Sequence, residues 1–160
     1  MKSAKFSASV FPVSFLLVLL VDGFLWFKSS WGKLSEGVFV DNLSGTLTKF
    51  ASKNPYPWFK DILNSYAIPN TAAVGAMIMY GEFFFAAAVL LSVLAIFGGV
   101  RDRWVLWLLG VGLLGLAAMN LVFWFAAGWT SPSTDSLNLL MLTVELVGLW
   151  LVYRSLMAKG

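Results

Sequence analysis

Long apolar runs alternate with short polar segments along most of the chain, and this alternation is its main structural signal. Four runs have about the 20 mainly apolar residues that a helix needs to cross a bilayer. The fourth run is the shortest and includes Ser136 and Arg154 at its ends. The pattern predicts an all-α integral membrane protein, a four-helix bundle that forms one domain over residues 1–160. The predicted spans are residues 8–27, 72–98, 104–127 and 136–154.

The first run has a second interpretation, because Lys2 and Lys5 precede it as they would in a secretory signal peptide. The residues from Asp22 to Trp26, which end the run, contain no small-x-small cleavage site. We therefore expect a retained membrane anchor.

The connection at residues 28–71 is too apolar for a solvated linker. Leu43, Leu47 and Phe50 recur at helical spacing before a break at Pro55-Tyr56-Pro57. A second apolar helix face follows the break and consists of Trp58, Phe59, Ile62, Leu63 and Tyr66. The pattern predicts two short amphipathic helices on the outer membrane surface. They either seal the bundle against lipid headgroups or form a lid over a site that opens outward.

The amino-acid composition agrees with a membrane protein and excludes several kinds of site. Hydrophobic residues make up 59% of the 160 residues and charged residues only 12%, whereas soluble domains have about 25% charged residues. The chain has no Cys and no His, which excludes disulfides, thiolate clusters and the usual zinc, copper and haem sites. We expect no metal or haem bound by this chain alone. Redox chemistry would need an organic cofactor, a substrate such as quinone, or a partner chain.

Lys and Arg residues beside the spans predict the orientation in the membrane. An arrangement with the amino terminus inside leaves the connection at residues 128–136, which has no Lys or Arg, on the outer side. The five Lys residues of the long connection count for less, because long loops cross largely regardless of charge. We expect the protein to lie in the cytoplasmic membrane, with both termini on the cytoplasmic side. The inner basic residues are Lys2, Lys5, Arg101, Arg103, Arg154 and Lys159.

The net charge of +3 is spread over loops beside the spans, so we expect contact with anionic lipid and no nucleic-acid partner. Lys28 and Lys33 stand out because they follow the first span at its outer end. They either extend toward lipid headgroups or draw a small anion toward the membrane.

Four polar residues lie inside the spans at similar depths. At 1.5 Å per residue from the outer end of each span, Asp22 lies roughly 8 Å in, Asn120 roughly 10 Å, and Glu82 and Glu145 roughly 12–15 Å. A carboxylate near the centre of a membrane helix costs on the order of 3 kcal/mol, so the three acids should face the bundle interior. They either hold the helices together or line a cavity that handles protons or binds a ligand.

Short motifs near the ends of the first two spans carry a family resemblance. Gly23-x4-Lys28 leads into Trp31-Gly32-Lys33-Leu34, and Tyr80-Gly81-Glu82 lies on the second span. The connection contains Asn54-Pro55-x-Pro57-Trp58-Phe59. Together, over residues 16–125, these motifs resemble the DoxX/DoxD-like membrane proteins. That family usually has an Arg near the start of its first helix, where this chain has only Lys2 and Lys5.

The resemblance implies a four-helix membrane bundle and a functional hypothesis. The best-known members are subunits of thiosulfate:quinone oxidoreductase, which couples oxidation of thiosulfate to tetrathionate with reduction of quinone. Carried over to this chain, the family's acidic position is Glu82 and its basic positions are Lys28 and Lys33. Glu145 and Asp22 are further catalytic candidates.

A quinone needs an apolar slot with aromatic walls and a proton donor. The candidates to form it are Trp26, Phe84, Asn120, Trp124 and Glu82. Because the chain has no metal ligands to relay electrons, either the two substrates meet directly or a partner subunit completes the site. The alternative is a non-catalytic subunit of a larger respiratory or membrane oxygenase complex, packed against metal-bearing chains and lipid.

Overall fold

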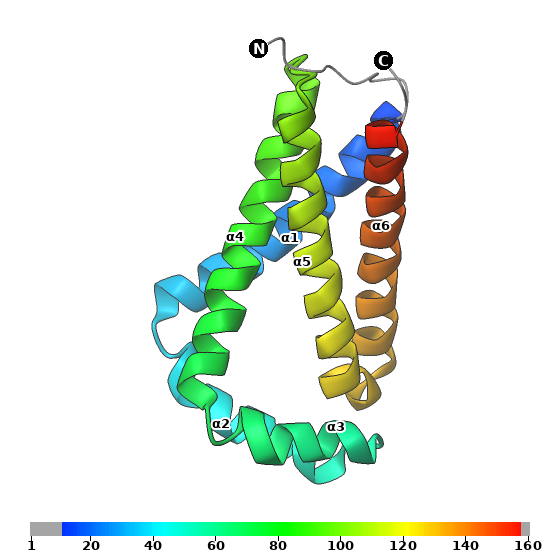
Figure 1. The fold of residues 1–160 in the computed structure, drawn as a ribbon. Coiled ribbons are helices and arrows are strands. Elements are labelled where there is room, and N and C mark those ends of the chain that lie inside the picture. The colour runs from blue at the N-terminus through cyan, green and yellow to red at the C-terminus, as the bar shows by residue number, and fades with distance from the viewer. Residues whose placement is uncertain (1–10, 158–160) are drawn as a thin grey trace.

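The computed structural model describes residues 11–157, which are almost entirely helical and contain no β-strand element (Figure 1). A π-helical turn, Leu63–Ala67, continues the third helix, and a 3-10 turn, Gly128–Thr130, precedes the last one. The prediction of an all-α chain is confirmed for this range. Its α-helices are α1 (Val13–Glu36), α2 (Phe39–Lys53), α3 (Pro57–Ile62), α4 (Thr71–Phe97), α5 (Arg103–Ala127) and α6 (Pro132–Met157).

Four of these helices, α1, α4, α5 and α6, are long and apolar enough to cross a membrane, as expected of a multi-pass membrane protein. Two of them extend beyond the predicted spans by more than one residue. α1 continues to Glu36 and ends at Gly37, whose φ of 69° is left-handed and suits a helix C-terminus. α6 begins at Pro132, where the Ser131 hydroxyl accepts a hydrogen bond from the Thr134 N–H.

The start of the first predicted span, at residues 8–10, lies outside the described residues. The same holds for three of the basic residues used for the orientation, Lys2, Lys5 and Lys159.

The long helices pack side by side through apolar and small residues. α5 packs between α4 and α6, while α1 packs against α4 and also touches α6 as it crosses behind α5 (Figure 1). Fully buried leucines of α5, including Leu109 and Leu113, lie at the centre of the core. Helices α4 and α5 approach closely at Gly112, where an added Cβ would lie only 2.9 Å from the Phe85 carbonyl oxygen. The core therefore depends on small residues as well as on large apolar ones.

Helices α2 and α3 lie across the end of the molecule opposite the start of α1 and the end of α6 (Figure 1). Leu43 and Leu47 of α2 are buried against a second apolar cluster that includes Phe59 of α3 and Ala126 of α5. Asn54 holds the break between the two helices in place, because its Nδ2 donates to the Phe125 carbonyl oxygen at 3.0 Å. The connection between α1 and α4 is thus an ordered helical layer that covers one end of the long helices.

Candidate functional site

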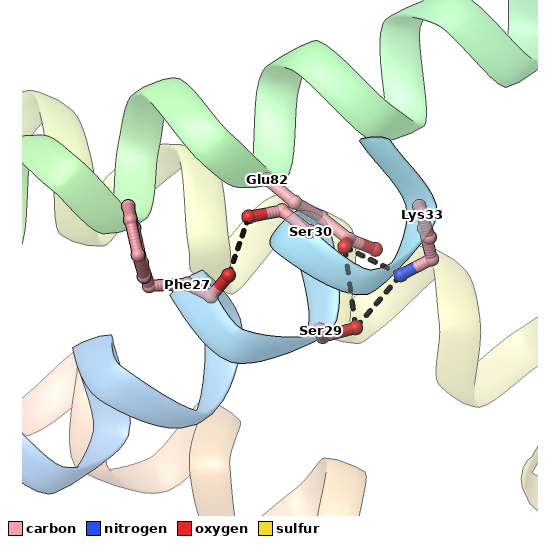
Figure 2. A network of polar contacts seen from close by, with 5 residues as sticks. All are labelled: Phe27, Ser29, Ser30, Lys33 and Glu82. Carbon is pink, nitrogen blue, oxygen red and sulfur yellow. Dashed lines mark hydrogen bonds and ion pairs between the residues drawn. The ribbon is translucent and has the colours of Figure 1, made fainter. Parts of the chain in front are cut away.

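A partly buried ion pair joins α1 to α4 (Figure 2). Lys33 Nζ lies 2.5 Å from Glu82 Oε2, and it also donates a hydrogen bond to Ser29 Oγ at 2.7 Å. The Ser29 hydroxyl in turn donates to the same carboxylate oxygen at 3.3 Å. Lys33, Ser29 and Glu82 therefore form one polar cluster, in which a cation and a hydroxyl converge on one oxygen of the acid.

The local sequence explains how the lysine reaches the acid. Ser29 and Lys33 are four residues apart on α1, so both side chains lie on the same helix face. Two residues before Ser29, the Phe27 ring packs against the Phe83 ring of α4 at 5.3 Å and keeps α1 close to α4. Lys33 also occupies the last turn of α1, where a positive charge is favourable.

The two partners of the ion pair differ in their exposure and in how completely they are bonded. The Lys33 side chain is 21% exposed, whereas the Glu82 side chain is fully buried. Lys33 Nζ lies 5.4 Å from the centre of the Phe39 ring. The second carboxylate oxygen, Glu82 Oε1, is buried and has no hydrogen-bond partner. Such an unpaired acceptor is costly, and it marks a place for a proton or for a donor from a ligand.

A second cluster surrounds Glu145 on α6. Asn120 Nδ2 of α5 lies 2.8 Å from both carboxylate oxygens, and Trp26 Nε1 of α1 donates to Oε1 at 3.0 Å. All three side chains are buried, and the Trp26 ring also contacts the Phe123 ring at 5.9 Å. Neutral N–H donors from two other helices thus hold this carboxyl group.

Asp22 belongs beside the second cluster. It is 5% exposed and lies one helical turn before Trp26, and its carboxyl group interacts electrostatically with that of Glu145. Its Oδ2 atom is buried and has no hydrogen-bond partner. All three acids are buried, in agreement with the expectation that they face the interior.

One face of α1 connects the two clusters. Asp22, Trp26, Ser29 and Lys33 follow one another at steps of 4, 3 and 4 residues, which is the spacing of a helix face. The stripe extends over roughly 16 Å of helix axis. Sequence reasoning missed Ser29, although this spacing from Asp22 and Lys33 was a usable signal.

Two of the predicted site residues lie outside both clusters. Trp124 Nε1 donates to Asp135 Oδ1 at 2.6 Å, and the Trp124 ring packs against Tyr56 and Phe125. Lys28 is exposed, in contrast to the partly buried Lys33. The structure therefore groups Asp22, Trp26, Asn120 and Glu145 together and Lys33 with Glu82, while Trp124 pairs with a residue that sequence reasoning did not select.

Two surface hollows lie apart from these clusters. One, of about 430 Å³, is on the exposed face of α6 and is lined by Thr143, Leu146, Val147 and Trp150. The other, of about 350 Å³, lies between α2 and the turn before α6 and is lined by Lys49, Phe50, Lys53, Trp129 and Thr130. Neither hollow is lined by a predicted site residue. Among residues 11–157, no group of three or more acids is placed to hold a metal ion.

No family model, curated protein or solved structure matches the chain. The possible function of the clusters therefore follows from their own chemistry and from the motif resemblance.

Proposed function

We propose that this chain is the membrane subunit of a thiosulfate:quinone oxidoreductase-like enzyme, which oxidises a small sulfur anion at the outer face and passes the electrons to quinone. One observation carries the proposal. Lys33 and Glu82, which the resemblance marks as a basic and an acidic position of the family, are 49 residues apart in sequence and form an ion pair. Two positions selected from separate motifs thus belong to one cluster.

In the proposed arrangement, the four long helices form a bundle across the cytoplasmic membrane, with α2 and α3 at the outer surface. Three of the described basic residues support this orientation, while the five Lys residues of the long connection count for less because long loops cross largely regardless of charge. Arg101 and Arg103 lie at the α4–α5 connection and Arg154 in the last turn of α6, at the end of the molecule opposite α2 and α3 (Figure 1). Arg103 also donates to the Leu156 carbonyl oxygen, which ties this end together. Basic residues on one side of the spans predict the cytoplasmic side.

The proposed reaction balances with two electrons. Two thiosulfate ions join through a new S–S bond to give tetrathionate, and the two electrons released reduce quinone, which takes up two protons. Lys33, which is partly exposed near the end covered by α2, provides a positive charge for the anion. Glu82 and Glu145 are the groups proposed to hold protons, and a quinone that approached Glu145 would meet the Trp26 and Phe123 rings beside it.

The absence of Cys and His from the chain leaves it without the usual redox metal ligands. Electrons would therefore pass directly between the substrates, or through a partner subunit. The proposal includes such a partner in the membrane or at its surface.

A second candidate function is an accessory subunit that packs against other chains of a respiratory or oxygenase complex. The observation in its favour is the exposure of α6. Only 17% of the most apolar stretch of α6 is buried, against 33–44% in the other long helices. A partner helix that covered the hollow beside Trp150 would bury this face.

The test is thiosulfate-dependent quinone reduction by the complex purified from its native membrane, followed by the absorbance of a soluble quinone analogue. Glu82→Gln removes the proton-holding group at the ion pair but keeps its shape. We expect it to lower turnover by about 100-fold, since positioned acid–base groups contribute about 10²–10⁴. Glu36→Gln, at an exposed acid in the last turn of α1, is the matched control.

Normal turnover by a folded Glu82→Gln complex would remove that residue from the reaction. If the wild-type complex lacked the activity but contained metal-bearing chains, the accessory role would replace the enzymatic one.

A further inference from the structure

Lys33 occupies a position between the molecular surface and a fully buried acid. Its side chain is 21% exposed, and its hydrogen-bond partner Ser29 is exposed, whereas Glu82 has no exposed area. An ion that arrives from outside can therefore meet Lys33 and Ser29 without reaching Glu82. The lysine end of the ion pair is thus accessible to an ion from outside, whereas the glutamate end is not.

The negative charge of Glu82 depends on this one lysine. Helices α1, α2 and α5 pack against α4. Among the titratable residues of these helices that the structure describes, only Lys33 contacts Glu82. A carboxylate left in a buried site without its cation is strongly unfavourable and is relieved by taking up a proton. The other titratable residues on these helices are Asp22, Lys28, Glu36, Asp41, Lys49, Lys53 and Arg103.

We propose that Lys33 is shared between Glu82 and a small dianionic oxoanion, so that binding of the anion loads one proton onto Glu82. The anion binds Lys33 and Ser29 at their exposed side and replaces Glu82 as the counter-ion of the lysine. Glu82 then takes one proton from water, and no electron moves in this step. This inference rests on the proposed function, because the anion is the sulfur substrate and the site is the same.

Two features of the cluster suit such an exchange. Glu82 Oε1 is buried without a partner, so a proton can occupy it without breaking any existing hydrogen bond. The Phe39 ring lies 5.4 Å from Lys33 Nζ, and a cation is attracted to an aromatic face at this distance. The ammonium group therefore keeps one favourable contact while it changes its anionic partner.

The exchange would give the proposed reaction a defined order. A proton is stored in the membrane interior only when the sulfur anion is bound, and it is then available for the reduced quinone. Without the anion, the site stays as the ion pair seen in Figure 2 and holds no transferable proton.

The experiment is calorimetric titration of the purified complex with sodium thiosulfate, without quinone, in MOPS and in Tris buffer. The two buffers differ in protonation enthalpy, so the difference in the measured heats gives the number of protons bound. We expect about one proton taken up per anion by the wild type at a pH where the ion pair is intact. Lys49→Ala, at an exposed lysine of α2, is the matched control and should behave as the wild type does.

Variants of the two partners of the ion pair should change the affinity for thiosulfate in opposite directions. Glu82→Gln removes the competitor for Lys33, so it should take up no proton and bind thiosulfate about tenfold more tightly. Lys33→Met combined with Glu82→Gln leaves the buried site uncharged, which favours normal folding, and should abolish anion binding.

Anion binding by the wild type without proton uptake would overturn this inference and leave the proposed function standing. Weaker anion binding by Glu82→Gln would also overturn it. Absence of any anion binding by the wild type would overturn both.

Discussion

Two glutamates on different spans are buried equally and are stabilised in opposite ways. Glu82 meets a lysine and a hydroxyl on one oxygen and leaves the other oxygen without a partner. Glu145 receives only neutral N–H groups, and both of its oxygens are bonded. A charged partner that is partly exposed can be exchanged for another ion, whereas an amide and an indole held in the core cannot leave. The comparison indicates an exchangeable site at Glu82 and a fixed junction of α1, α5 and α6 at Glu145.

Removing the lysine gives the largest expected effect. Lys33→Met leaves the fully buried Glu82 without its cation, and breaking a buried ion pair costs about 3–5 kcal/mol. We expect a loss at the lower end of this range, because the carboxyl group can take a proton. The measurement is unfolding of the purified protein in detergent, by heat or by titration with a denaturing detergent.

Adding Glu82→Gln to Lys33→Met should recover most of that loss, since no unpaired charge then remains. A double variant as unstable as the single one would contradict the view that charge pairing, and not packing of the lysine stem, stabilises this cluster.

The second prediction concerns the neutral cluster. Asn120→Leu keeps a similar volume but removes the donor shared by both oxygens of Glu145. We expect a loss of about 1–3 kcal/mol, the cost of a buried acceptor left without its partner. The same unfolding measurement applies. The control is Thr143→Val on the exposed side of α6, which also replaces a polar side chain by an apolar one of similar volume.

Anion affinity separates the two clusters further. Asn120→Leu should leave thiosulfate binding unchanged, because Asn120 contacts neither Lys33 nor Ser29 in the described structure. A variant with normal stability and lost anion binding would show that the two clusters act as one site.

The sequence was sufficient for the long helices, because crossing a bilayer requires a run of apolar residues of a set length. Counting residues from the span ends placed Asn120, Glu82 and Glu145 at similar depths but did not show which of them meet, and the structure pairs Asn120 with Glu145 rather than with Glu82. Burial of the three acids followed from the cost of exposing a carboxylate to lipid.

The contacts of Lys33 and Trp124 could not be predicted from the apolar runs, because they depend on where the helices end and how they are rotated. Lys33 reaches Glu82 because α1 continues to Glu36 as a helix and keeps the lysine on the same face as Ser29. Trp124 was expected near the acids, but α6 starts at Pro132 and brings Asp135 in its first turn to the indole N–H. Helix ends and helix rotation set these contacts, and neither is fixed by hydrophobicity alone.

The smallest expected effect comes from Ser29, and it distinguishes exchange from simple stabilisation. Ser29→Ala removes a hydroxyl that accepts from Lys33 and donates to Glu82, yet the residue is exposed and water can replace it. We expect at most about 1 kcal/mol of lost stability. If the hydroxyl also binds the anion at the exposed side, thiosulfate affinity should fall by about threefold to tenfold. An unchanged affinity would restrict the anion to Lys33 and make Ser29 a part of the resting ion pair only.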